Sequence, residues 1–192
     1  MDNMNDLKDL LQFDLQHLTS VEDQIIEALP AMIEKAHNTR LKQALENHLQ
    51  VTKVQRNRLD QVQQLLGGST SGTSTDMGIF SGLFDMGSKS KGMAGLIDDG
   101  QKVLALDMDP AVKDAAIIGC AQKIEHVEIA CYGTAKTYAE QLGLLDVAQL
   151  LQQTLLEEHD ADDLLTSLAV GGVNQKAEAG TETSSASTTS YR

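Results

Sequence analysis

Acidic residues interrupt the apolar face of a long helix predicted between Ile117 and Leu142. Apolar residues recur there at steps of four and three, which is typical of the core-facing side of an amphipathic helix, and Glu128 occupies the middle of that series. Glu125 lies one turn earlier on the same side. Two buried ionised carboxylates without a partner would cost more free energy than packing contributes. The sequence therefore predicts that a positive charge neutralises Glu125 and Glu128.

Polar residues stand at mid-height of the other predicted apolar faces as well. Carboxylate oxygens and an imidazole suit hard divalent cations, and the charge of a bound metal removes the cost of burying the acids. The pattern thus predicts a site for divalent metal, iron or manganese. Its candidate ligands are Glu22, His48, Asp99, Glu125, Glu128 and Glu158.

A second interpretation needs no metal. The same acids could pair with Lys or Arg, since buried ion pairs also occur as purely structural features. The basic residues whose positions on the predicted helices would bring them near these acids are Lys53, Arg56, Arg58, Lys102 and Lys123.

The histidines and amides have alternative roles too. His48 is either a metal ligand or a core histidine bonded to one of the acids. Thr52 and Gln55 are expected to orient carboxylates rather than to bind metal. His17, His37 and His126 fall off the core-facing positions and are expected to face solvent.

The same periodicity predicts five helices that position these residues, at 5–36, 39–66, 91–106, 110–143 and 146–168. Pro30 is expected to kink or restart the first helix. Asn38 and Thr39 supply a turn and a cap, and Asp109-Pro110 is typical of a helix start. The stretch 67–92, rich in Gly, Ser and Thr, is predicted to be a long flexible crossover.

Composition indicates one all-α domain. The chain has 192 residues, is 41% hydrophobic, and contains no Trp and only three Phe and three Tyr. A core of Leu, Ile, Val, Ala and Met suits helix packing better than a strand sandwich. We expect residues 1–170 to form the bundle. Residues 171–192, which are rich in Ser and Thr, are expected to be a disordered tail.

Charge and cysteine content exclude several classes of partner. The net charge of −13, from 15 basic and 28 acidic residues, argues against binding nucleic acid. The sequence contains no apolar run of membrane-spanning length, and no signal peptide is recognised at Met1. Cys120 and Cys131 lie eleven residues apart on one predicted helix, about 16 Å at 1.5 Å per residue, so they cannot pair with each other. A cytoplasmic location is the expectation.

Several motifs resemble the ferritin-like YciE/YciF family of bacterial stress-associated proteins. The most specific is Glu125-His126-x-Glu128-Ile129 followed by Tyr132-Gly133. Others are Val21-Glu22-Asp23-Gln24, His48-Leu49-x-x-Thr52-x-x-Gln55, Met93-x-Gly95-Leu96-Ile97-x-Asp99-Gly100, Asp114-Ala115-Ala116 and Thr154-Leu155-x-Glu157-Glu158.

This resemblance implies a ferritin-like up-down bundle, a homodimer, and an architecture related to di-iron carboxylate proteins. The chain lacks the two Glu-x-x-His motifs of true di-iron proteins and has Asp99 where relatives have Glu. The sequence therefore leaves open whether the protein binds one metal ion or two.

The expected function is that of a ferritin-like stress-response protein. It would bind iron or manganese in its core and could handle peroxide or dioxygen there. The alternative is a non-enzymatic structural or partner-binding bundle, so enzymatic activity is left open. Iron storage would need a multi-subunit shell, which the sequence does not indicate.

Overall fold

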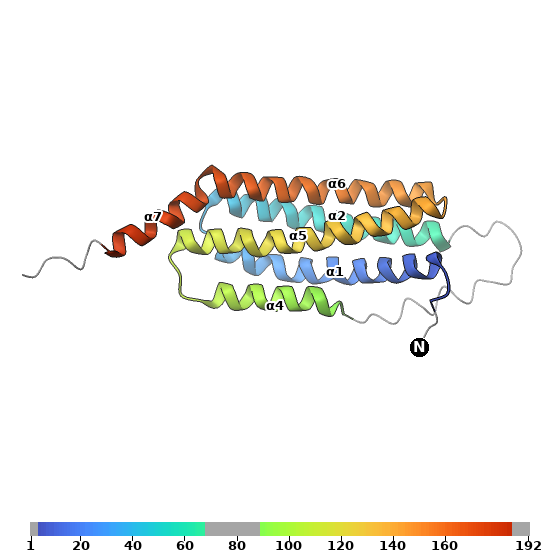
Figure 1. The fold of residues 1–192 in the computed structure, drawn as a ribbon, viewed down its shortest axis with the longest axis horizontal. Coiled ribbons are helices and arrows are strands. Elements are labelled where there is room, and N and C mark those ends of the chain that lie inside the picture. Colours follow the sequence, from blue (N-terminus) through green and yellow to red (C-terminus); the bar gives the residue numbers. More distant parts are fainter. Residues whose placement is uncertain (1–3, 68–88, 186–192) are drawn as a thin grey trace, which may run out of the picture.

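The computed structural model describes residues 4–67 and 89–185. Four long helices of this part run side by side along the longest axis: α1 (Leu7–Lys35), α2 (Thr39–Gly67), α5 (Pro110–Gln141) and α6 (Leu145–Leu168) (Figure 1). The shorter α4 (Lys91–Ala105) packs on the outside, against α1 and α5. A π-helical turn, η1 (Ala169–Val173), leads into α7 (Asn174–Ser185). These residues form no strand, which confirms the all-α class for the described chain.

The helices form two antiparallel pairs. α1 contacts α2, α5 contacts α6, and the pairs meet through contacts of α1 with α5 and of α2 with α6. α2 and α5 run in the same direction (Figure 1), so the chain must return along the bundle between them, and α4 forms part of that return. Most of the crossover predicted at 67–92 lies outside the described residues. In the described part, no helix is long and apolar enough to span a membrane.

Helix starts follow the predicted capping residues. The side chain of Asn38 accepts hydrogen bonds from the backbone N–H groups of Arg40 (3.0 Å) and Leu41 (3.2 Å) at the start of α2. Asp109 accepts one from Ala111 (2.9 Å), with Pro110 in the first turn of α5. Such caps satisfy backbone donors that have no partner inside the helix.

The predicted restart of the first helix at Pro30 is wrong, whereas the alternative, a kink there, stays a prediction. The helix continues through Pro30 to Lys35. The Pro30 side chain is exposed, whereas Leu29 and Met32 on either side are buried in the core. Packing of these neighbours therefore holds the helix across a residue that locally disfavours it.

The core consists of two apolar clusters, one towards each end of the bundle. On α1 the first cluster holds Ile25, Leu29 and Met32, and the second holds Leu11, Leu15 and Leu18. Buried polar side chains and the partly buried His48 lie between the clusters, and we call these residues the polar layer. Its members are Glu22, His48, Thr52, Gln55, Glu125, Glu128, Thr154 and Glu158.

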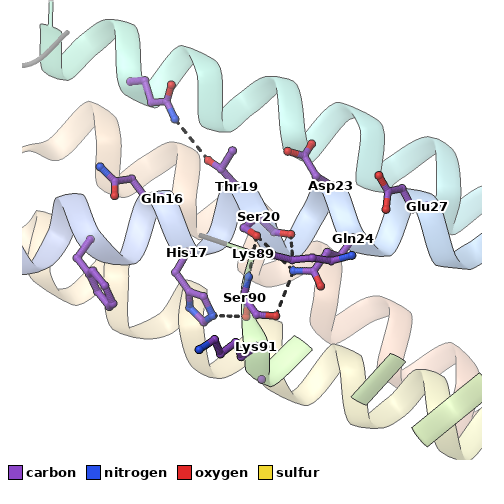
Figure 2. Close-up of a pocket in the computed structure, with 13 residues that line it drawn as sticks. Gln16, His17, Thr19, Ser20, Asp23, Gln24, Glu27, Lys89, Ser90 and Lys91 are labelled. Carbon is purple, nitrogen blue, oxygen red and sulfur yellow. Dashed lines mark hydrogen bonds between the residues drawn. The ribbon is translucent and has the colours of Figure 1, made fainter. Parts of the chain in front are cut away.

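The start of α4 is tied to α1 by a hydrogen-bonded group (Figure 2). His17 Nε2 lies 2.6 Å from Ser90 Oγ, and the backbone N–H of Ser90 donates to Ser20 Oγ at 2.9 Å. Gln24 Nε2 donates to the carbonyl oxygen of Ser90 at 3.3 Å. His17 is thus half-buried against α4 rather than facing solvent, which corrects our expectation.

The expectation of a disordered tail at 171–192 is wrong for the residues of α7. Asn174–Ser185 are helical, and α7 contacts α5. Gly172 adopts φ +129°, a conformation open to glycine, and this turn redirects the chain between α6 and α7 while burying Val173. Residues 186–192 lie outside the described residues.

We predict that Asp114→Ala will destabilise the bundle by about 1–3 kcal/mol, because it removes the acceptor of two backbone donors. Buried Asp114, on α5, accepts from the N–H groups of His37 (2.7 Å) and Asn38 (2.8 Å) in the α1–α2 turn. Urea unfolding followed by circular dichroism measures the loss. The control is Asp163→Ala, at an exposed position of α6. Equal midpoints for both variants would contradict the anchoring role.

Candidate metal centre

Four buried or nearly buried side chains from three helices converge in the polar layer. They are His48 of α2, Glu125 and Glu128 of α5, and Glu158 of α6, and one ligand atom from each lies within 4.8 Å of the others. Glu125 and Glu128 share one face of α5 because residues three apart are neighbours on a helix. We call these four residues the candidate metal centre.

The carboxylates of the centre have oxygen atoms without hydrogen-bond partners. Glu125 and Glu158 each leave Oε2 unpaired, and Glu128 leaves both oxygens unpaired. Glu125, Glu128 and Glu158 are at most 2% exposed, so water does not replace the missing partners at the surface. Buried polar atoms are normally paired, and a group of unpaired ones that face each other is what a cation would satisfy.

His48 lies at the edge of the centre. Its Nε2 atom is 3.2 Å from Glu125 Oε1 but makes no hydrogen bond there. Burial lowers the pKa of His48 below its ordinary value, an effect that nearby Glu158 partly opposes. The imidazole is therefore neutral at pH 7, which is the form that binds metal.

Without a cation, the acids of the centre hold protons. Burial, together with nearby charge, raises the pKa of Glu158 to about 9 and that of Glu125 to about 7. Burial and the repulsion of Glu158, Glu22 and Glu125 raise the pKa of Glu128 well above its ordinary value. Desolvation is the largest cause in each case, as expected for carboxylates removed from water.

Glu22 lies beside the centre but is not one of the four converging residues. It is fully buried on α1, and the hydroxyl of Tyr132 donates a hydrogen bond to its Oε1 atom, while Oε2 is unpaired. Burial raises the pKa of Glu22 to about 8, and repulsion by Glu158 contributes to that rise. The charge of the candidate metal centre thus also affects the pKa of Glu22. The sequence motif contained Tyr132, but we did not predict its contact with Glu22.

Hydrogen bonds from α2 orient the acids of α6. Gln55 Nε2 donates to Glu158 Oε1 at 2.5 Å, which confirms the predicted orienting role of Gln55. Arg58 donates to both oxygens of Glu157, at 2.8 and 2.9 Å, and to Thr154 Oγ1. Thr52 differs from expectation, because its hydroxyl donates to the backbone oxygen of His48 rather than to a carboxylate.

Asp99 lies away from the centre. Its side chain on α4 is 76% exposed and pairs with Lys102. α4 packs outside, against α1 and α5, and its buried residues are Met93 and Leu104 rather than the residues of the predicted face around Asp99. The structure therefore does not bring Asp99 together with the other predicted ligands.

The cations considered in the second interpretation pair with other acids. Arg56 binds Asp23 and Asp60, Arg58 binds Glu157, and Lys102 binds Asp98 and Asp99. Lys53 and Lys123 are exposed. Arg56 and Arg58 lower the pKa of Glu22 only through space. These five side chains therefore do not neutralise the centre by direct ion pairs.

Known proteins resemble this chain over most of its length. Protein YciF of Escherichia coli (strain K12) is 39% identical over 176 residues, which cover 92% of this chain and 98% of that protein. The crystal structure of the E. coli stress protein YciF superposes with a TM-score of 0.76 at 36% identity, covering 89% of this chain and 99% of that chain. The structure of YcfI from Rhodopseudomonas palustris superposes with a TM-score of 0.74 at 36% identity, covering 86% of this chain and 96% of that chain.

The family model described as a domain of unknown function, DUF892, matches residues 6–178. This match spans the described bundle and includes every residue of the candidate metal centre. Together with the likeness to YciF, it confirms the predicted family resemblance and the ferritin-like bundle. The chain belongs to the DUF892 family.

Proposed function

We propose that this protein binds one or two divalent metal ions, iron or manganese, in its bundle core and acts in a bacterial stress response. The observation that carries the proposal is the convergence of His48, Glu125, Glu128 and Glu158 with unpaired carboxylate oxygens. The stress role is extended from the E. coli relative, which is described as a stress protein.

The residues present fit a hard divalent cation. Three carboxylates and a neutral imidazole are suitable ligands for iron or manganese. Glu22 would either complete the set or accept a hydrogen bond beside it, because its Oε2 atom is unpaired while Tyr132 holds Oε1. Gln55 would keep Glu158 in place. Asp99 is not part of the proposed ligand set.

Any chemistry would depend on both the metal and its surroundings. A bound iron or manganese ion can act on peroxide or dioxygen at an open coordination position. The protein would supply the carboxylates, which must release their protons when the metal binds. The two apolar clusters on either side would limit the access of water.

A structural bundle without metal is the competing function. It is favoured by the raised pKa values of Glu22, Glu125 and Glu158, since protons alone can neutralise these acids. The R. palustris relative is described as a candidate structural protein. The homodimeric state and the cytoplasmic location stay predictions under both proposals.

We predict that protein purified without chelators contains iron or manganese and that Glu128→Gln removes it. Glutamine keeps the shape of the side chain but removes a charged ligand. Glu22→Gln should weaken binding about 10–100-fold if Glu22 supports the ligands from outside. Metal content is measured by mass spectrometry, with Glu46→Gln, at an exposed position of α2, as the control.

Added metal should also raise the melting temperature. At about 100 times the Kd, binding to the native state contributes about 2.7 kcal/mol, which for a chain of this size corresponds to roughly 5–10 °C. Glu128→Gln should abolish this shift. A native protein that contains no metal, and whose melting temperature does not change when iron or manganese is added, would refute the metal site and support the structural bundle.

We predict that the stability of chelator-treated protein falls as pH rises from about 5 to 9. The unfolded glutamates ionise near 4.5, whereas the native state keeps Glu125, Glu22 and Glu158 protonated until about 7, 8 and 9. Between these values the native state binds more protons than the unfolded state, so each step up in pH destabilises it. Denaturant unfolding at several pH values measures the slope of the free energy of unfolding against pH.

Glu158→Gln provides the matched comparison, since its amide cannot ionise. Its slope between pH 5 and 9 should be shallower than that of the native sequence. Saturating metal should also flatten the slope, because the cation replaces the protons. Stability that rises with pH across this range would contradict the assignment of protonated acids.

A further inference from the structure

A hollow of ≈ 250 Å³ between α2 and α6 reaches the candidate metal centre. His48 and Glu125 form part of its wall. At its outer side it is lined by the residues Val51 and Leu164, which are 36% and 47% exposed. The hollow therefore connects the molecular surface with the His48–Glu125 edge of an otherwise buried site.

The wall of the hollow is mostly apolar. Two of its residues, Ala44 and Ala161, have small side chains, and its other apolar residues are larger. Since a site lined in this way binds polar ions poorly, it favours molecules with little need for hydration. The apolar residues of the wall are Ala44, Leu45, Val51, Ala161, Leu164 and Leu165.

The charged groups of the wall disfavour anions. Asp160 is exposed beside the hollow, and Glu157 also lines it. Arg58 pairs with Glu157 and offsets its charge, whereas Asp160 has no such partner among the ion pairs of the described chain. An approaching anion would meet the charge of Asp160, and this repulsion would slow its entry.

We propose that this hollow is the route by which a small uncharged molecule, of the size of dioxygen or peroxide, reaches the metal. The proposal rests on the proposed metal-binding function and adds the path and the charge of the molecule that uses it. Ala161 is the position where added bulk would close the path. His48 and Glu125 are the ligands that such a molecule meets first.

The test uses nitric oxide as an uncharged probe on the full chain loaded anaerobically with Fe(II). Stopped-flow absorbance follows its binding to the metal. Ala161→Leu should slow this binding about tenfold or more and leave the iron content unchanged. Ala130→Leu, an exposed position on α5, is the matched control and should bind nitric oxide at the native rate.

A second variant opens the route instead of closing it. Leu164→Ala removes bulk at an exposed edge, so it should fold normally and speed nitric oxide binding a few-fold. If Ala161→Leu loses its iron, the rate with Leu164→Ala decides the question. An unchanged rate in that variant would overturn the route.

Azide tests the charge selectivity. Asp160→Asn should speed azide binding roughly threefold at low salt, because one repulsive charge is removed, and leave the nitric oxide rate unchanged. Equal effects on both probes would overturn the proposed selectivity for uncharged molecules.

The failure of this proposal can be separated from the failure of the metal site. Protein that binds Fe(II) in native amounts but takes up nitric oxide at one rate in all these variants overturns the route alone. Protein that binds no Fe(II) overturns both.

Discussion

The cost of burying carboxylates in the middle of the bundle governs this structure. Glu22, Glu125, Glu128 and Glu158 lie between two apolar clusters, almost without access to water. Each must be neutralised by a proton, a cation or a hydrogen bond, since an isolated buried charge is not tolerated. Their raised pKa values express this constraint in the absence of metal.

The surrounding residues hold this costly layer in one arrangement. Tyr132 binds Glu22, Gln55 binds Glu158, and Arg58 connects α2 with Glu157 of α6. A fully apolar core would be simpler to stabilise, because a half-satisfied polar group is worse than none. The unpaired oxygens of Glu128 are therefore the clearest reason to connect the layer with function rather than with stability.

The candidate metal centre lies nearest to solvent at His48. α1 and α5 present fully buried acids, whereas His48 on α2 keeps 12% of its side chain exposed. That histidine and Glu125 form part of the wall of the hollow between α2 and α6. Under our proposal, this hollow decides which molecules meet the metal ligands. Its wall has small and aliphatic residues.

The sequence by itself determined the five helices from α1 to α6, the caps at Asn38 and Asp109, and the height of the polar layer, because period and capping chemistry are local. Only the tertiary structure decided which polar residues meet. Asp99 follows the same pattern as Glu22, yet α4 packs outside and exposes it. On α5 the steps of three and four, continued from Glu128, lead to Cys131 and Tyr138, whereas Tyr132 and Ala139 are the buried residues. A helix of 3.6 residues per turn drifts from a seven-residue repeat, so the buried face shifts around α5 along its length. The contact of Tyr132 with Glu22 then depends on how α1 and α5 pack together.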